Sequence, residues 1–207
     1  MLHPGRHTHA AQSPSSYPLS HTHHQHHPYP NPTFQELGAC TSSPPAGITV
    51  TLPNEADLHK WHVIIDGPDA TAYAGGRFGL VVTLPPEYPF KAPAVTFATR
   101  IYHPNVTNDS AGSICLALLK AENWKPSTRL AGVLEAVRAL LVEPQPDDPL
   151  EARIADEYRS ERKEFEKNAR AYTLRYARGP VKFDTAPAEG EEGKAAGSSA
   201  AAGSGGP

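Results

Sequence analysis

The sequence predicts an α+β fold in which a four-stranded antiparallel meander sheet packs against helices, with disordered tails at both ends. Three observations lead to this prediction. Four short runs rich in β-branched and aromatic residues follow one another with no helical segment between them. Helical periodicity of apolar residues begins only after them. Both ends of the chain lack any apolar periodicity. A run of strands followed by helices is typical of the α+β class.

The four predicted strands are separated by short segments rich in turn residues. The strands are predicted at residues 48–50, 60–66, 77–84 and 94–97. Gly67-Pro68-Asp69 and Gly75-Gly76 lie in one connection, and Pro93 directly precedes the last strand. Because no connection holds a crossover helix, each strand is expected to pair antiparallel with the one before it.

The helices are predicted from apolar residues at helical spacing. The first long helix carries six such residues on one face: Leu130, Val133, Leu134, Val137, Leu140 and Leu141. Ser127 or Thr128 is expected to cap its start, and Glu143-Pro144 to end it. A second helix is expected at about 149–158, and a third at about 165–176, which stops near the following glycine.

Composition divides the chain into one domain and two tails. Its length of 207 residues fits a single domain with extensions. Residues 1–32 are rich in His, Pro, Ser and Gln, and residues 179–207 in Gly, Ala, Ser and Glu. Neither segment can bury a core, so both are predicted to be disordered, and the folded domain is predicted at 33–178. The histidine cluster at 21–27 could bind zinc or nickel opportunistically, but a low-complexity tail is the simpler interpretation.

Charge and cysteine content exclude several classes of function. A net charge of −3, from 19 basic and 22 acidic residues, gives no basic footprint for nucleic acid and no polybasic membrane anchor. The sequence shows no signal peptide and no membrane span, so a soluble protein of the cytoplasm, the nucleus or both is expected. The two cysteines, Cys40 and Cys115, are therefore expected as free thiols. No cofactor and no metal site is predicted, because the domain lacks a closed ligand set and a Gly-rich phosphate loop.

The candidate site lies between the last strand and the first long helix. This segment holds Tyr102-His103-Pro104-Asn105 and, ten residues after Asn105, Cys115. A thiol can accept an acyl group from another thioester without a strong base beside it. An amide such as that of Asn105 can donate to the oxyanion that forms when the acyl group leaves. Thiol and amide suit acyl carriage better than peptide hydrolysis, which needs a histidine base against the thiol. From spacing alone, a cysteine in this setting is more often a small buried apolar residue with no chemistry.

From about Pro44 to Arg178 the chain resembles the ubiquitin-conjugating enzymes. The resemblance is carried by Trp61, Ile65–Pro68, Tyr88–Pro93, Tyr102–Asn105, Ile114–Leu116, Trp124–Pro126 and Glu143–Leu150. His-Pro-Asn, then Cys-Leu, then Trp-x-Pro is a combination specific to that family. The fold that the resemblance implies, a four-stranded meander backed by helices, agrees with the order of elements predicted above.

The resemblance implies a role for each residue of the site. Cys115 would take the C-terminal carboxyl of ubiquitin from an activating enzyme, where the ATP is consumed. Asn105 would stabilise the oxyanion or hold the loop. His103 would hydrogen-bond the active-site loop rather than act as a base. The Tyr88-Pro89 bond falls at a position that is often cis in the family.

The resemblance also implies partners. Phe90 and Pro126 would offer an apolar patch to ubiquitin ligases, with Lys125 beside them and Trp124 supporting them from behind. Lys125 and residues 155–163 look most like the members that serve ligases with a catalytic cysteine of their own, the HECT and RBR classes. The expected partners are ubiquitin, its activating enzyme and these ligases, and the chain is expected to be a monomer.

Two acidic positions bear on which acceptor is preferred. Family members that discharge directly to lysine usually have Asp two residues after the catalytic cysteine, where this chain has Ala117. The second acidic position is retained as Asp148. A pair of carboxylates would orient an incoming lysine and remove its charge. With half of the pair missing, slow attack by lysine and preferred transfer to a ligase cysteine are expected. Lys91, Lys120 and Lys125 are expected near the site as rim charges.

The start of the domain departs from the family pattern. The family opens with a basic amphipathic helix that meets the activating enzyme, but here only residues 34–37 keep that pattern and Gly38 disfavours a helix. We expect either impaired loading or a natural start elsewhere, with preference for the second. Cys40, in this stretch, is expected to be a bystander. Two alternatives to a ubiquitin carrier stay open: a carrier of a ubiquitin-like modifier, and a catalytically poor scaffold of the same fold.

Overall fold

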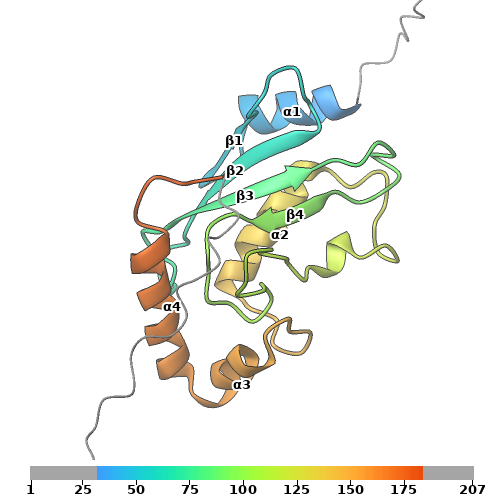
Figure 1. Ribbon diagram of the computed structural model, residues 1–207. Coiled ribbons are helices and arrows are strands. Elements are labelled where there is room, and N and C mark those ends of the chain that lie inside the picture. Colours follow the sequence, from blue (N-terminus) through green and yellow to red (C-terminus); the bar gives the residue numbers. More distant parts are fainter. Residues whose placement is uncertain (1–31, 184–207) are drawn as a thin grey trace, which may run out of the picture. The chain divides into compact units, whose positions relative to one another are not determined.

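The computed structural model describes residues 32–183, in which a four-stranded antiparallel sheet is combined with four α-helices (Figure 1). The strands are β1 (Ile48–Thr51), β2 (Lys60–Asp66), β3 (Arg77–Thr83) and β4 (Ala94–Phe97). The helices are α1 (Pro32–Ser42), α2 (Leu130–Val142), α3 (Ala152–Ser160) and α4 (Arg162–Tyr176), with a 3₁₀ turn, η1 (Ala117–Leu119). The predicted α+β class is confirmed. The histidine cluster and most of both predicted tails lie outside the described residues.

The sheet is the predicted meander. Its strand order is β1-β2-β3-β4, and every neighbouring pair is antiparallel. Along β2 the side chains of Trp61, Val63 and Ile65 are fully buried, while the residues between them are half-buried. Because side chains alternate between the two faces of a strand, one face of the sheet forms one side of the core.

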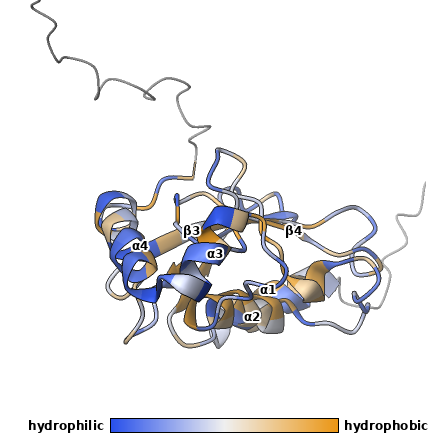
Figure 2. Ribbon diagram, turned by 90° about the horizontal axis from the view of Figure 1, so that it is seen from below, coloured by the Kyte–Doolittle hydropathy of each residue, from blue (hydrophilic) through white to orange (hydrophobic). Residues whose placement is uncertain are grey.

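Helix α2 supplies the other side of the core. It lies against the sheet in Figure 1, and Figure 2 shows it as largely apolar, whereas α4 is mostly hydrophilic. All six apolar positions predicted for its core-facing side are buried, from Leu130 to Leu141. Burying a Leu or Val side chain contributes roughly 1.5–3 kcal/mol, so this helix is held mainly by packing. The later helices begin at Ala152 and Arg162, within a few residues of their predicted starts.

Helix α1 is longer than the four residues that the sequence predicted. It spans Pro32–Ser42 despite Gly38 and despite the absence of any basic residue. Two of its residues, Thr33 and Cys40, are buried, and Cys40 belongs to the hydrophobic core. Tertiary packing has therefore overridden a weak local propensity.

The cap of α2 comes from α1 rather than from the preceding residues. The N-cap residue of α2 is Arg129, which makes no capping hydrogen bond with its side chain, so the prediction of Ser127 or Thr128 was wrong. Instead the Leu130 N–H donates to the Glu36 carboxylate at 3.0 Å. A carboxylate at a helix N-terminus satisfies an unpaired N–H and complements the helix dipole.

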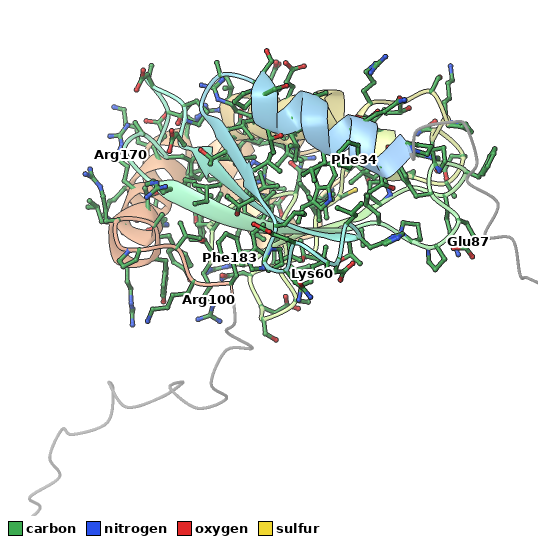
Figure 3. All side chains as sticks on the ribbon, turned by 90° about the horizontal axis from the view of Figure 1, so that it is seen from above. Phe34, Lys60, Glu87, Arg100, Arg170 and Phe183 are labelled. Atoms are coloured by element: carbon green, nitrogen blue, oxygen red, sulfur yellow. The ribbon has the colours of Figure 1, made fainter. Side chains whose placement is uncertain are left out.

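The chain after α4 returns along the sheet. Val181 and Phe183 lie over Gly79 of β3, where a Cβ would come within 2.3 Å of Val181 Cγ1. The Phe183 ring also stacks on His62 of β2, with ring centroids 3.9 Å apart. Figure 3 labels Phe183 where this segment lies along the sheet. The predicted tail began at residue 179, so its first residues are packed against the sheet instead. Among the residues described, no helix has the length and apolar composition to cross a bilayer.

Candidate active site

Cys115 lies on the returning arm of the loop that joins β4 to η1. Its backbone N–H donates to the Asn105 carbonyl at 2.9 Å. One isolated β-bridge pairs Val106 with Ile114 and another pairs Thr96 with Ser113. The loop therefore folds as a short extension of the sheet edge, which fixes Cys115 next to Asn105.

A glycine allows this loop to lie against β4. Gly112 has a φ of +54°, and a Cβ there would lie 2.0 Å from the Phe97 carbonyl oxygen. The same two residues are joined by a hydrogen bond from the Phe97 N–H to the Gly112 carbonyl, at 2.8 Å. Only glycine combines this backbone conformation with so close an approach.

The Asn105 side chain is buried and holds the loop that carries Asp148. Its amide nitrogen donates to the backbone carbonyls of Gln145, at 2.7 Å, and Asp148, at 2.9 Å. Its amide oxygen accepts the Gln145 N–H at 2.9 Å. Both amide protons are thus used within the protein. Of the two roles that the resemblance implied for Asn105, these hydrogen bonds fit the second, in which the side chain holds the loop.

The His103 ring is also used to hold backbone. Its Nδ1 accepts the Asn105 N–H at 3.0 Å, so its Nε2 carries the proton and donates to the Leu140 carbonyl, also at 3.0 Å. The side chain is fully buried, and this burial lowers its pKa to about 4. A neutral ring with both nitrogens engaged links the active-site loop to the end of α2, as the resemblance implied.

The thiol of Cys115 meets a carboxylate and an ammonium. Its Sγ donates to Asp148 Oδ2 at 3.3 Å, and Lys120 Nζ donates to the same oxygen at 2.5 Å. Partial burial, followed by the hydrogen bond and charge of Asp148, raises the pKa of the Cys115 thiol. Lys120 and then Cys115 hydrogen-bond Asp148 and hold the pKa of its carboxyl below the usual value. In return Asp148 raises the pKa of the Lys120 ammonium.

Sequence reasoning placed Lys120 only among the rim charges. Its partner Asp148 is 28 residues away in the chain, and no local pattern indicates that the two side chains meet. The contact depends on Asn105, which fixes the backbone at Asp148, and on η1, which directs the chain after Cys115.

This arrangement suits an acyl carrier. Cys115 is half-buried, so its sulfur is reachable by another protein. A thiol with a raised pKa is a poorer leaving group, which slows uncontrolled loss of an acyl group from it. The partner of the sulfur is a carboxylate and not an imidazole, so the geometry differs from the thiol–histidine pair of a protease.

The predicted ligase-binding residues gather around one indole ring. Trp124 is buried, and its Nε1–H donates to the Pro89 carbonyl at 2.8 Å, which ties the two loops together. Phe90, next to Pro89, is 79% exposed. Lys125 and Pro126 are exposed beside Trp124. The Tyr88-Pro89 bond is cis, as the resemblance suggested.

The remaining cysteine is separate from this site. Cys40 is fully buried in α1, and burial followed by the charge of Glu36 raises its pKa to about 11. Within residues 32–183, no group of three or more His, Cys, Asp or Glu side chains is arranged to hold a metal ion.

Comparison with known proteins gives the family of the chain. The model of the family described as "Ubiquitin-conjugating enzyme" matches residues 33–173. The chain is also 46% identical over 144 residues to ubiquitin-conjugating enzyme E2 14 of Schizosaccharomyces pombe. That alignment covers 70% of this chain and 91% of the relative. The chain therefore belongs to the ubiquitin-conjugating enzyme (E2) family, whose members are transferases that work with ubiquitin, an activating enzyme and ubiquitin ligases.

Proposed function

We propose that Cys115 carries ubiquitin as a thioester from the activating enzyme and passes it preferentially to the catalytic cysteine of a HECT or RBR ligase. The observation that carries the proposal is the contrast between the two thiols. Cys115 is half-exposed in a loop fixed by Asn105, whereas Cys40 is fully buried. Only a reachable sulfur can attack the thioester of a partner protein.

Loading and transfer are both thiol exchanges. In loading, the Cys115 sulfur attacks the carbonyl carbon of the ubiquitin thioester on the activating enzyme. A new C–S bond forms, the old C–S bond breaks, and the activating enzyme leaves as a thiolate. The thiol proton of Cys115 has an acceptor at hand, because Sγ already donates to Asp148 Oδ2 at 3.3 Å. Transfer to a ligase thiolate repeats these steps with Cys115 as the leaving group.

The preference for a cysteine acceptor is supported by the groups that face the thioester. A lysine acceptor must lose a proton before it can attack, and a carboxylate near the sulfur assists that loss. Ala117, two residues after Cys115, offers no carboxylate, so Asp148, which accepts a hydrogen bond from the thiol, is left to do this. A cysteine thiolate needs no such help.

The first test is loading of the purified chain with activating enzyme, ATP and ubiquitin, followed by a non-reducing gel. We expect an adduct that thiol reductant removes and that Cys115→Ala lacks. Cys115→Ser should give an oxygen ester that resists reductant, and Cys40→Ala should load as the unmodified chain does. The same reaction with ubiquitin-like modifiers and their own activating enzymes tests the alternative carrier.

A folded chain that does not load would contradict the proposal and favour the scaffold alternative. This outcome has a specific cause to examine, because α1 holds no Lys or Arg. Introducing basic residues on the exposed positions of α1 then distinguishes a weak encounter with the activating enzyme from an inactive Cys115.

The second test follows discharge in a single turnover. Loaded protein is mixed with free lysine or free cysteine after the activating enzyme is stopped. We expect fast loss of ubiquitin to cysteine and slow loss to lysine, and comparable fast rates on both would contradict the preference.

The ligase surface is tested by Phe90→Ala. This change should weaken binding and transfer to a HECT or RBR ligase while loading stays normal, because the ring is exposed and supports no core residue. An exposed apolar control outside this surface and outside α1 is Leu174→Ala on α4. We also propose that the chain acts as a monomer, which sedimentation of the loaded and unloaded forms would test.

A further inference from the structure

The ammonium of Lys120 is paired with the carboxylate of Asp148, which also contacts the sulfur of Cys115. The Asp148 Oδ2 atom accepts from Cys115 Sγ at 3.3 Å and from Lys120 Nζ at 2.5 Å. Two groups therefore share one oxygen. The Asn105 amide holds the backbone carbonyl of Asp148 at 2.9 Å, which fixes the point of the backbone from which the carboxylate extends.

The two acceptor types need this oxygen to different degrees. When a lysine attacks a thioester, the C–N bond forms, the C–S bond breaks, Cys115 leaves as a thiolate, and the attacking nitrogen gives up a proton. A nearby carboxylate receives that proton and first draws in the ammonium form by its charge. When a ligase thiolate attacks, C–S replaces C–S and no proton is transferred. An unpaired carboxylate would instead repel that thiolate.

We propose that Lys120 is a specificity-determining residue that reserves the thioester for cysteine acceptors. Its ammonium neutralises Asp148 and fills the place that the amine of an acceptor lysine would take. The inference rests on the proposed thioester at Cys115. It assigns to Lys120 a part of the acceptor preference that the missing acid at Ala117 does not account for.

An ordinary surface ion pair would have no such effect, and the chain offers one for comparison. On α4, Lys167 Nζ lies 2.9 Å from Glu164 Oε1, and both side chains are exposed. The Lys120–Asp148 pair differs in that its oxygen also contacts the reactive sulfur. Lys120 and Asp148 are 38% and 58% exposed, so solvent screens their attraction. We therefore expect the pair to change the rate of lysine discharge by no more than about fivefold.

The test compares discharge of four loaded proteins: the unmodified chain, Lys120→Met, Lys120→Arg and the control Lys167→Met. Lys120→Met should discharge to free lysine about fivefold faster and to free cysteine no faster than the unmodified chain. Lys120→Arg keeps the cation and should restore slow lysine discharge. Lys167→Met should match the unmodified chain on both acceptors.

A double variant separates competition for the carboxylate from simple crowding. If Lys120 acts through Asp148, then Lys120→Met with Asp148→Asn should lose the gain in lysine discharge. A gain that persists in the double variant, or no gain in Lys120→Met, would overturn the inference.

Loading is measured first so that the two proposals can fail separately. Cys115 is charged by the activating enzyme or, without it, by exchange with a small-molecule thioester of ubiquitin. If neither route gives a reductant-sensitive adduct, the thioester proposal fails and this inference falls with it. If loading is normal and the acceptor ratio is the same in all four proteins, only the role of Lys120 fails.

Discussion

Replacing Asn105 by alanine separates a loop-holding amide from an oxyanion donor. The side chain is 1% exposed and makes three hydrogen bonds to the backbone of Gln145 and Asp148. At roughly 1 kcal/mol of net stability for each bond, Asn105→Ala should lower the free energy of unfolding by about 3 kcal/mol. For a domain of this size that corresponds to a fall of about 6–12 °C in Tm.

The assay is urea or thermal unfolding followed by tryptophan fluorescence, run beside single-turnover discharge of the loaded protein. Asn123→Ala is the matched control, because its exposed amide donates a single bond, to the Ala117 carbonyl at 2.9 Å. We expect the control to lose less than about 1 kcal/mol.

The result that would contradict this prediction is a large loss of rate without a loss of stability. Direct donation to an oxyanion accounts for about 100- to 1,000-fold in rate. If Asn105→Ala slows discharge by that factor and its stability stays within about 0.5 kcal/mol of the unmodified chain, then the amide leaves the loop during the reaction. The reasoning from the three hydrogen bonds would then be refuted.

Three further predictions concern the supports of the site. The pKa of His103 is lowered to about 4 from an ordinary 6.5, so between these values the unfolded chain binds a proton that the folded chain does not. Stability should therefore be lost as pH falls from about 6.5 toward 4, by up to ~1.4 kcal/mol per pH unit, and urea midpoints of His103→Gln should show a shallower slope. Gly112→Ala should destabilise by more than about 2 kcal/mol or fail to fold, because its φ is +54° and its Cβ would lie 2.0 Å from a strand carbonyl oxygen. Gly132→Ala, in α2 with nothing within 4 Å, should instead stabilise by roughly 0.5–1 kcal/mol, and equal effects of the two changes on Tm would contradict the geometry. Glu36→Ala removes the acceptor of the Leu130 N–H and should cost about 1 kcal/mol in urea unfolding, whereas no change would show that water replaces the cap.

The strands and α2 could be predicted because local chemistry and tertiary demand agree. Residues 60–66 are rich in β-branched and aromatic side chains and alternate between buried and less buried positions. The apolar residues of α2 recur at helical spacing over the whole of Leu130–Val142. In both segments a short window of sequence already contains the information that the fold uses.

Helix α1 and the cap of α2 could not be predicted in this way. Gly38 lowers the local helix propensity, and tertiary contacts such as the burial of Cys40 against the core compensate for it. The bond between Glu36 and the Leu130 N–H joins residues 94 positions apart. Such a contact depends on how two elements pack, which no window of sequence contains.

The residues of the candidate site could be predicted from the sequence, but the contacts between their side chains could not. The resemblance pointed to Cys115, Asn105, His103 and Asp148, and the structure shows that Asp148 contacts the sulfur. Whether the Asn105 amide faced an oxyanion or a loop depended on the direction of one side chain. The contact with Lys120 depended on a loop that the amide itself fixes. The preference for HECT or RBR ligases stays a prediction.

Because Cys40 of α1 is buried against the core, its thiol can report how often α1 opens away from the core. A thiol-reactive dye should label Cys115 quickly in the native protein, since the only other cysteine is fully buried and has a pKa raised to about 11. The slower rate at which the dye labels Cys40 then reports how often α1 separates from the core. The ratio of that rate to the rate in an unfolded chain gives the free energy of undocking directly. No engineered probe is required. A partner that binds α1 and holds it against the core would slow the labelling of Cys40.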